Sequence, residues 1–160
     1  MFRLDRVNKG IIGHLQDGRK SYKKIAVALK VSENTVKTRV RKLVAEGILR
    51  IAGYVDPGVM ESHQIAYLGV KLKDMDYLTK GEEISRLERV VSVAVVTGRF
   101  DLIVMVHLKH GFNLLRFLSE KLSKIDRIDA IETFMVYKGL NIKVPYIVDA
   151  KDMGEYDLNL

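Results

Sequence analysis

Apolar residues between positions 21 and 47 recur every three or four residues, the spacing that places side chains on one face of a helix. The pattern spans two short stretches that are separated by a tight turn. Its inner positions are Ile25, Ala26, Leu29, Val31, Val36, Val40 and Leu43. The pattern predicts two amphipathic helices around a turn, which is the arrangement of a helix-turn-helix motif.

Capping residues mark where the helices begin. Asp5 precedes a first helix, and Ser32 precedes the second helix of the motif. A side-chain oxygen at such a position accepts a hydrogen bond from an unpaired backbone N–H of the first turn. Glu33 adds negative charge near the positive end of the helix dipole. The apolar side of the first helix is formed by Val7, Ile11, Ile12 and Leu15.

The segment that follows the motif changes character. Residues 48–57, ILRIAGYVDP, are rich in β-formers, and we interpret them as a wing followed by a link to the next domain. Asp56-Pro57-Gly58 is the clearest turn signal and marks a boundary. We therefore divide the chain into a helix-turn-helix domain at 1–50, a linking strand or hinge at 51–60, and a second domain at 61–160.

Beyond the boundary, strand-like and helical patterns alternate. Strands are expected at 65–72, 90–97, 102–108 and 130–137. Helical spacing lies around Ile84 and Leu87, and again from Phe112 to Ile125. The order βαββαβ is that of a ferredoxin-like fold, an antiparallel sheet with two helices on one face. The predicted fold class is α+β, with a winged helix-turn-helix domain before a ferredoxin-like domain.

One face of such a sheet carries no helix. Residues 102–108, LIVMVHL, are apolar on both sides of their strand, and Val91, Val93 and Val95 share one side of theirs. A bare apolar sheet face is typical of an interaction surface. We expect it to be buried against a second copy, and the resulting dimer presents two helix-turn-helix motifs to DNA half-sites.

The outer side of the second helix of the motif carries side chains suited to DNA. Advancing about 100° per residue from Val36 reaches Asn34, Thr38 and Arg41 on the opposite side. Arg pairs with guanine, Asn with adenine and Thr with a base edge, whereas Lys contacts phosphate. The predicted base contacts are Asn34, Thr35, Thr38 and Arg41. The predicted phosphate contacts are Arg19, Lys20, Ser21, Tyr22, Lys37 and Lys42.

Charge is distributed unevenly along the chain. Residues 1–60 carry a net charge of +8, whereas residues 61–160 carry a net charge of −1. A basic module joined to a near-neutral one favours polyanion binding by the first and a separate role for the second. The alternative is a solvated charged face on a three-helix scaffold.

Other classes of function find little support. The chain has no cysteine, which excludes disulfides and thiolate metal sites. It has no apolar run of about eighteen residues and no secretory signal, so we expect a cytoplasmic protein. His107 and His110 form no metal site, because no third ligand recurs at metal-site spacing. Phosphate loops and nucleophile elbows are absent, and we expect no enzyme activity and no cofactor.

Short motifs in both halves of the chain resemble those of the Lrp/AsnC family, the feast/famine transcriptional regulators. They are Leu4-Asp5, Asp17-Gly18-Arg19, Ile25-Ala26, Val31-Ser32, Thr35-Val36, Arg39-Val40, Leu43, Gly47-Ile48, Asp56-Pro57, residues 96–101 (VTGRFD) and Glu132-Thr133. The resemblance implies an N-terminal DNA-binding domain, a linking strand and a C-terminal domain for the regulation of amino acid metabolism. It also implies dimers that often assemble further, commonly into octamers, and an amino acid or related metabolite as effector.

The resemblance places the effector near residues 98–101 and the strand that holds Thr133. The implied effector residues are Gly98, Arg99, Asp101, Thr133 and Phe134. A carboxylate such as Asp101 can pair with an α-ammonium group, and backbone N–H groups beside Gly98 can hold an α-carboxylate. The alternatives are a hairpin turn without ligand at 98–101 and an ordinary cross-strand β-former at Thr133.

The chain departs from the family pattern at Asn8, where an acidic residue is usual, and at Asp126-Arg127-Ile128, where many members carry Pro-Gly-Val. A rival hypothesis is an enzyme similar to the siroheme decarboxylases, which share the two-domain architecture. Such an enzyme is expected to carry a His-, Tyr- and Arg-rich stretch where this chain has residues 96–101. We therefore predict a sequence-specific DNA-binding transcriptional regulator whose DNA binding or assembly responds to an amino acid or related metabolite.

Overall fold

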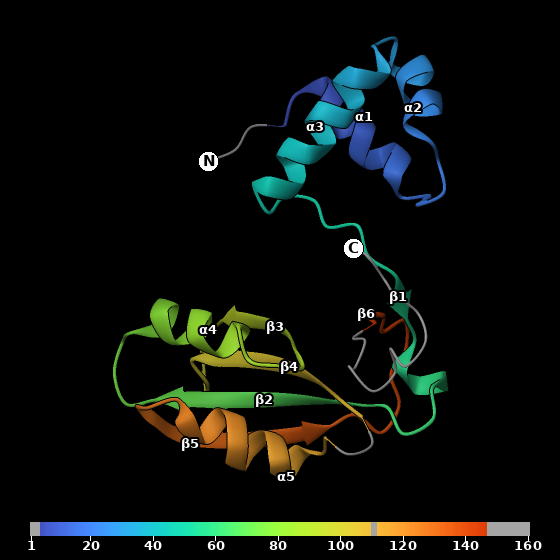
Figure 1. The fold of residues 1–160 in the computed structure, drawn as a ribbon. Coiled ribbons are helices and arrows are strands. Elements are labelled where there is room, and N and C mark those ends of the chain that lie inside the picture. The colour runs from blue at the N-terminus through green and yellow to red at the C-terminus, as the bar shows by residue number, and fades with distance from the viewer. Residues whose placement is uncertain (1–3, 110–111, 147–160) are drawn as a thin grey trace. The chain divides into compact units, whose positions relative to one another are not determined.

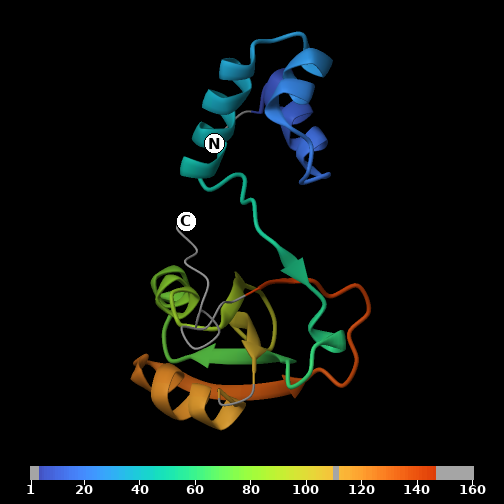
Figure 2. The same ribbon diagram turned by 45° about the vertical axis from the view of Figure 1, so that its right-hand side comes forward.

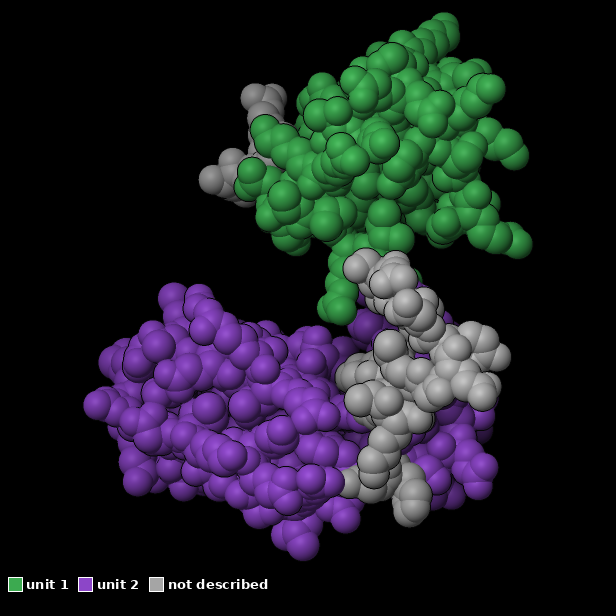
Figure 3. Space-filling view, viewed as in Figure 1, with its two compact units in different colours: residues 1–52 green, residues 53–160 purple. Residues whose placement is uncertain are grey.

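A computed structural model describes residues 4–109 and 112–146 of the chain (Figure 1). The chain divides into two compact units, residues 1–52 and residues 53–160, which Figure 3 shows in green and purple. We refer to them as the helical unit and the sheet unit. Among the described residues, no helix is both long and apolar enough to cross a membrane.

The helical unit consists of three helices that pack against one another (Figure 2). They are α1 (Arg6–Leu15), α2 (Tyr22–Leu29) and α3 (Glu33–Ala45). Their shared core consists of Ile11, Ile25, Ala26, Val36, Val40 and Leu43, with Leu29 and Val31 half-buried at its edge. The helical spacing of these apolar positions therefore predicted the buried side of each helix correctly.

Both predicted caps are present. The Asp5 carboxylate accepts a hydrogen bond from the Asn8 backbone N–H at 2.7 Å, at the start of α1. Ser32 Oγ accepts one from the Thr35 backbone N–H at 3.0 Å, at the start of α3. Each bond satisfies a donor that the first turn of a helix otherwise leaves unpaired.

The sheet unit contains one four-stranded antiparallel sheet in the order β3-β4-β2-β5 (Figure 1). Its strands are β2 (Gln64–Leu72), β3 (Val90–Val95), β4 (Leu102–Leu108) and β5 (Ile128–Met135). Helix α4 (Tyr77–Ser85) joins β2 to β3. A helical segment joins β4 to β5, and it comprises α5 (Leu114–Arg116), a π-helical turn (Phe117–Lys121) and a 3-10 turn (Leu122–Lys124). The order confirms the predicted ferredoxin-like fold.

Both helical segments cover the same face of the sheet. Ile84 of α4 and Phe117 and Leu122 of the second segment are buried against alternate residues of β2 and β4. The strand residues of this core are Ala66, Leu68, Val70, Leu72, Leu102, Val104, Val106 and Leu108. Because side chains alternate along a strand, Tyr67, Ile103 and Met105 lie on the opposite, bare face.

The prediction that Val91, Val93 and Val95 share one side of β3 is wrong for Val91. The register between β3 and β4 shifts between Val90 and Ser92, which is a β-bulge. A bulge inserts a residue and reverses the alternation that follows it. Val90 and Val93 therefore pack against the core, so Val91 does not share one side of the strand with Val93.

The expected wing is also absent from the described part of the helical unit. The β-rich segment forms only β1 (Tyr54–Val55), which belongs to the sheet unit and pairs with β6 (Val144–Pro145). A wing is a hairpin and needs two neighbouring strands, whereas this segment supplies one. Its backbone groups find their partner about ninety residues later in the chain, beside an ion pair between Asp56 and Lys143.

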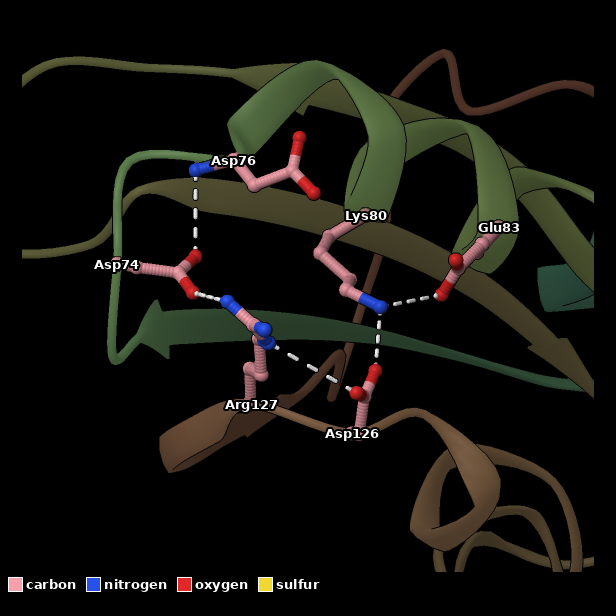
Figure 4. A network of polar contacts seen from close by, with 6 residues as sticks. All are labelled: Asp74, Asp76, Lys80, Glu83, Asp126 and Arg127. Carbon is pink, nitrogen blue, oxygen red and sulfur yellow. Dashed lines mark hydrogen bonds and ion pairs between the residues drawn. The ribbon is translucent and has the colours of Figure 1, made fainter.

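A network of ion pairs holds the turn before β5, where the family pattern is broken (Figure 4). Arg127 has φ 63°, the left-handed conformation that glycine adopts most readily. Its guanidinium pairs with Asp74, and the neighbouring Asp126 pairs with Lys80. The Lys80 ammonium also lies 2.9 Å from Glu83 and is buried. The turn thus keeps a left-handed residue without glycine, and its charges tie it to the loop before α4 and to α4 itself.

Candidate nucleic-acid interface and effector site

The turn between α2 and α3 is short because one residue adopts a left-handed conformation. Lys30 has φ 55° and ψ 45°, and its backbone N–H donates to the carbonyls of Ala26 and Val27. This geometry ends α2 and redirects the chain within two residues to Ser32, which caps α3. The helix-turn-helix predicted from the apolar pattern is therefore present, and α3 is its second helix.

The predicted base contacts separate into two groups. Asn34, Thr38 and Arg41 are exposed on the side of α3 opposite the buried Val36. Thr35 is half-buried, and its hydroxyl lies 2.8 Å from Ser32 Oγ, within the cap of the helix. The outer side of α3 therefore brings together three of the four predicted base readers.

The predicted phosphate-contact residues also differ in whether their side chains are exposed or engaged within the helical unit. Arg19, Lys37 and Lys42 are exposed, although the Arg19 guanidinium lies 3.5 Å from Asp17. Three further candidates are engaged within the helical unit: Ser21 caps α2 through the Lys24 N–H, Lys20 Nζ lies 2.8 Å from His14 Nδ1, and Tyr22 packs against the core. A phosphate contact by Lys20 therefore requires it to give up its bond to His14.

Arg39 is half-buried and has a structural role. Its guanidinium donates to Asn8 Oδ1 at 3.0 Å and also pairs with Asp5. The Asn8 N–H and the Arg39 guanidinium hold the pKa of the Asp5 carboxyl below its ordinary value. Asn8, where the chain departs from the family pattern, is buried and joins α1 to α3. Only the chain's folding shows this contact, since the two residues are 31 positions apart.

The carboxylate of Asp101 is satisfied inside the sheet unit. One oxygen accepts from the Leu72 N–H at 2.8 Å and the other from Lys71 Nζ at 3.0 Å. These two bonds, the Leu72 N–H first, hold the pKa of Asp101 below its ordinary value. Asp101 is 8 % exposed and joins the β3–β4 turn to the end of β2. The arrangement fits the hairpin-turn alternative for this residue, because its bonds need no ligand.

The neighbours of Asp101 are more accessible. Gly98 is exposed with φ 129°, a conformation that favours glycine. Arg99 is exposed and forms an ion pair of 2.6 Å with Glu132 of β5. The Arg99 guanidinium also lies 5.4 Å from the centre of the Phe100 ring. This exposed ion pair at the turn offers both signs of charge within one small area.

The ion pair lies beside an aromatic cluster on the bare face of the sheet. Phe100 meets Phe134 edge to face, with ring centres 6.2 Å apart. A Cβ at Gly69 would lie only 2.6 Å from the Phe100 ring, so this ring rests directly on the β2 backbone. Phe134 pairs with Tyr67 in the sheet, whereas Thr133 pairs with Leu68 of the core. Thr133 therefore faces the helices, away from Phe134 and the aromatic cluster.

Three residues of this cluster are not among the predicted effector residues: Gly69, and also Phe100 and Glu132, which lie within the family motifs. A glycine inside a strand signals close approach of another group, and this signal was present in residues 65–72. The pairing of Glu132 with Arg99 had no comparable signal, because it depends on how β5 lies beside β2. Of the candidate effector residues, Arg99 and Phe134 are thus accessible to a ligand, whereas Asp101 is bonded within the sheet unit and has a structural role.

The histidine considered as a metal ligand has another histidine as its neighbour. His107 Nε2 lies 2.9 Å from His63 Nδ1, and His107 is fully buried. No group of three His, Cys, Asp or Glu residues is close enough to hold a metal ion in the described part of the chain. His110 lies outside the described residues.

Comparisons with known proteins agree with the two units. Residues 4–44 match the AsnC-type helix-turn-helix domain, and residues 65–143 match the Lrp/AsnC ligand binding domain. The chain is 35% identical over 132 residues to the HTH-type transcriptional regulator PH0140 of Pyrococcus horikoshii, which covers 81% of this chain and 84% of that protein. The HTH-type transcriptional regulator FL11 of the same organism is 28% identical, over 84% of this chain and 90% of its own length.

Structural comparison gives the same result. The structure of Escherichia coli AsnC matches with a TM-score of 0.61 and 26% identity, over 86% of this chain and 95% of that protein. These relatives are transcriptional regulators, and none of them supports the alternative of an enzyme similar to the siroheme decarboxylases. The chain belongs to the Lrp/AsnC family, as a transcriptional regulator with a helix-turn-helix domain and a ligand-binding domain.

Proposed function

We propose that this regulator recognises a specific operator as a dimer, with α3 in the major groove, and that an amino acid changes its DNA binding or assembly. The observation that supports the DNA-reading part is the exposure of Asn34, Thr38 and Arg41 on one side of α3. Each of these side chains bonds or packs against base edges in known major-groove contacts. Protein side chains alone supply this chemistry, so no cofactor is required.

The surrounding charges provide affinity rather than sequence preference. Lys37 and Lys42 are exposed on α3, the helix of the reading side chains, and Arg19 is exposed between α1 and α2; all three contact phosphate in this proposal. Ser21 and the first backbone N–H groups of α2 approach a further phosphate, which the helix dipole favours. Each phosphate contact releases counterions, so affinity falls as salt is raised.

Fluorescence anisotropy tests the proposal directly. The full chain is titrated into the duplex upstream of its own gene and into a shuffled duplex of the same composition, at near-physiological salt. We expect the native duplex to bind about a thousandfold more tightly than the shuffled one. This ratio lies at the lower end of the range for sequence-specific DNA-binding proteins. Equal affinity for shuffled DNA and for every duplex from the region upstream of the gene, with and without amino acids, contradicts sequence recognition.

A variant pair assigns the binding to α3. Arg41→Ala is expected to lower affinity for the operator about tenfold or more and to relax the preference at one base pair. Arg86→Ala removes the same charge from an exposed position of the sheet unit and serves as the control. If the two variants bind alike, Arg41 does not read a base.

The effector part rests on the exposed ion pair between Arg99 and Glu132. We propose that an amino acid exchanges with this pair, its carboxylate binding Arg99 and its ammonium group binding Glu132. An exposed ion pair contributes little to stability, so its exchange for a zwitterion costs little. The adjoining rings of Phe100 and Phe134 favour an apolar or aromatic effector side chain.

A panel of amino acids tests this site. We expect an apolar or aromatic member to raise the melting temperature of the sheet unit, because a ligand stabilises the state it binds. Arg99→Ala should abolish that increase, whereas Arg86→Ala, which breaks the surface pair with Glu82, should keep it. An increase that survives Arg99→Ala places the effector elsewhere, and no response to any member contradicts an amino acid effector.

The dimer is proposed to form through the bare face of the sheet. Ile103 and Met105 on this face are only half-buried, and Phe134 is 46 % exposed. Light scattering is expected to give at least a dimer, and Met105→Glu to shift it towards monomer, since the charge would be buried at the interface. A monomer at micromolar concentration contradicts this part. A regulator of this kind needs access to genomic DNA, so we propose that it acts in the cytoplasm.

A further inference from the structure

Glu33 is an acidic side chain at the end of α3 that the proposed function directs towards DNA. It is the first residue of α3 and is exposed. Its unit is strongly basic, since residues 1–52 carry 13 Lys or Arg against 4 Asp or Glu, a net charge of +9. A carboxylate near phosphates is repelled unless it finds a hydrogen-bond donor of its own. The helix dipole favours an acid at this position, but it supplies no side-chain donor for the Glu33 carboxylate beside DNA.

Other acids of the helical unit have structural partners. Asp5 pairs with Arg39 and caps α1, and Asp17 pairs with Arg19. In the described part of this unit, Glu33 and Glu46 form no ion pair, and they stand at opposite ends of α3. Glu33 is also not required as a cap, because Ser32 already accepts the Thr35 N–H. The Glu33 carboxylate is thus left available for an outside donor.

The first turn of a recognition helix is the part that reaches base edges in helix-turn-helix proteins. In this chain that turn consists of Glu33, Asn34 and Thr35. The Thr35 hydroxyl is withdrawn into the cap with Ser32, so Glu33 and Asn34 remain to reach the bases. The Glu33 carboxylate only accepts hydrogen bonds, whereas the Asn34 amide both donates and accepts them. Together the two side chains can distinguish neighbouring base pairs.

We infer that Glu33 is a specificity-determining residue that accepts a hydrogen bond from the N4 amino group of a cytosine in the major groove. Cytosine and adenine are the bases that present an amino donor there. Adenine places the N7 acceptor beside its amino group, and this acceptor repels a carboxylate, whereas cytosine presents no acceptor of its own on that edge. The inference rests on the proposed placement of α3 in the major groove.

Site selection with three full-length proteins tests the inference. The wild-type chain first selects its preferred duplex from a randomised library, and every base pair of that site is then substituted singly. Anisotropy gives the base preference at each position for the wild type, Glu33→Gln and Glu46→Gln. Glu46→Gln is the matched control, because it removes the same charge about 20 Å away along the helix. Thermal melting verifies that all three proteins are folded.

Glu33→Gln should lose about tenfold of the preference for cytosine at one position of each half-site. It should gain affinity for adenine at that position, because a Gln side chain pairs with adenine N6 and N7. All other positions should keep their preferences, and Glu46→Gln should keep all of them. If Glu33→Gln binds every duplex more tightly by one common factor, Glu33 serves only the helix dipole and the inference is wrong.

Failure of the underlying function gives a different result. A wild-type chain that selects no sequence contradicts the proposed DNA recognition itself, and the role of Glu33 falls with it. A wild-type chain that selects a site and a Glu33→Gln variant that retains the same base preferences contradict only the role of Glu33.

Discussion

Acid should destabilise the sheet unit through the buried histidine pair. His107 is fully buried, and its Nε2 atom lies 2.9 Å from His63 Nδ1. Burial first, and then the nearby charges of His63, Arg89 and Lys109, lower the pKa of His107 from 6.5 to about 4. The neutral imidazole is therefore the form that the folded sheet unit accepts, whereas the unfolded chain binds a proton at its ordinary pKa.

The sign and size of the effect follow from that difference. Between about pH 6.5 and pH 4 the unfolded state binds the proton and the folded state does not, so stability is complete above this window and is lost as pH falls through it. A shift from 6.5 to about 4 corresponds to a loss of up to about 3 kcal/mol across the window. This is a large part of the stability of a small domain.

Urea denaturation followed through the NMR signals of β4 amides reports on the sheet unit alone. The wild type and His107→Phe, which keeps a ring but removes the titrating group, are compared at several pH values between about 7 and 4.5. The free energy of unfolding should fall with pH more steeply in the wild type than in the variant. Equal slopes for the two proteins would refute the reasoning, since the titrating group would then lie elsewhere.

Three further predictions concern contacts seen only in the structure. Gly69→Ala should destabilise the sheet unit by about 1 to 3 kcal/mol, because the new Cβ meets the Phe100 ring at 2.6 Å, and Phe100→Leu should restore part of the loss in thermal melting. Asn8→Leu should lower the free energy of unfolding of the helical unit by about 1 to 2 kcal/mol in urea titrations, since Arg39 loses an acceptor; an unchanged value would show that Asp5 alone suffices. Asp101→Asn should weaken the sheet unit at neutral pH and flatten its acid dependence near and below pH 3.8, because the stability from a carboxyl of lowered pKa is present above that value and lost below it. Melting curves of wild type and variant that differ by a constant across this range would contradict the last prediction.

Local sequence signals were sufficient to predict the helices and strands themselves. The spacing of Val36, Val40 and Leu43 defines one helical face wherever the helix lies, and Ser32 caps the backbone three residues ahead of it. Both features act within a turn or two of the helix, so no distant partner is needed to predict them. The βαββαβ order likewise follows from alternating patterns, and the motifs in both halves were enough to identify the family.

Signals of this kind could not locate the bulge in β3 or the pairing of β1 with β6. A bulge changes which residues face the core, but it is set by how one strand packs against its neighbour. The short strand β1 contains only Tyr54 and Val55, and its sequence contains no information about which distant segment will supply its hydrogen bonds.

The candidate sites divide in the same way. Sequence alone determined that α3 is amphipathic, that its outer side carries Asn34, Thr38 and Arg41, and that positive charge is concentrated in the first part of the chain. Only the tertiary structure decided that the carboxylate of Asp101 accepts a hydrogen bond from the Leu72 N–H and that Arg99 forms an ion pair with Glu132. The physical reason is range: helix periodicity and capping act over a few residues, whereas these contacts join residues about thirty positions apart that only the folded sheet brings together.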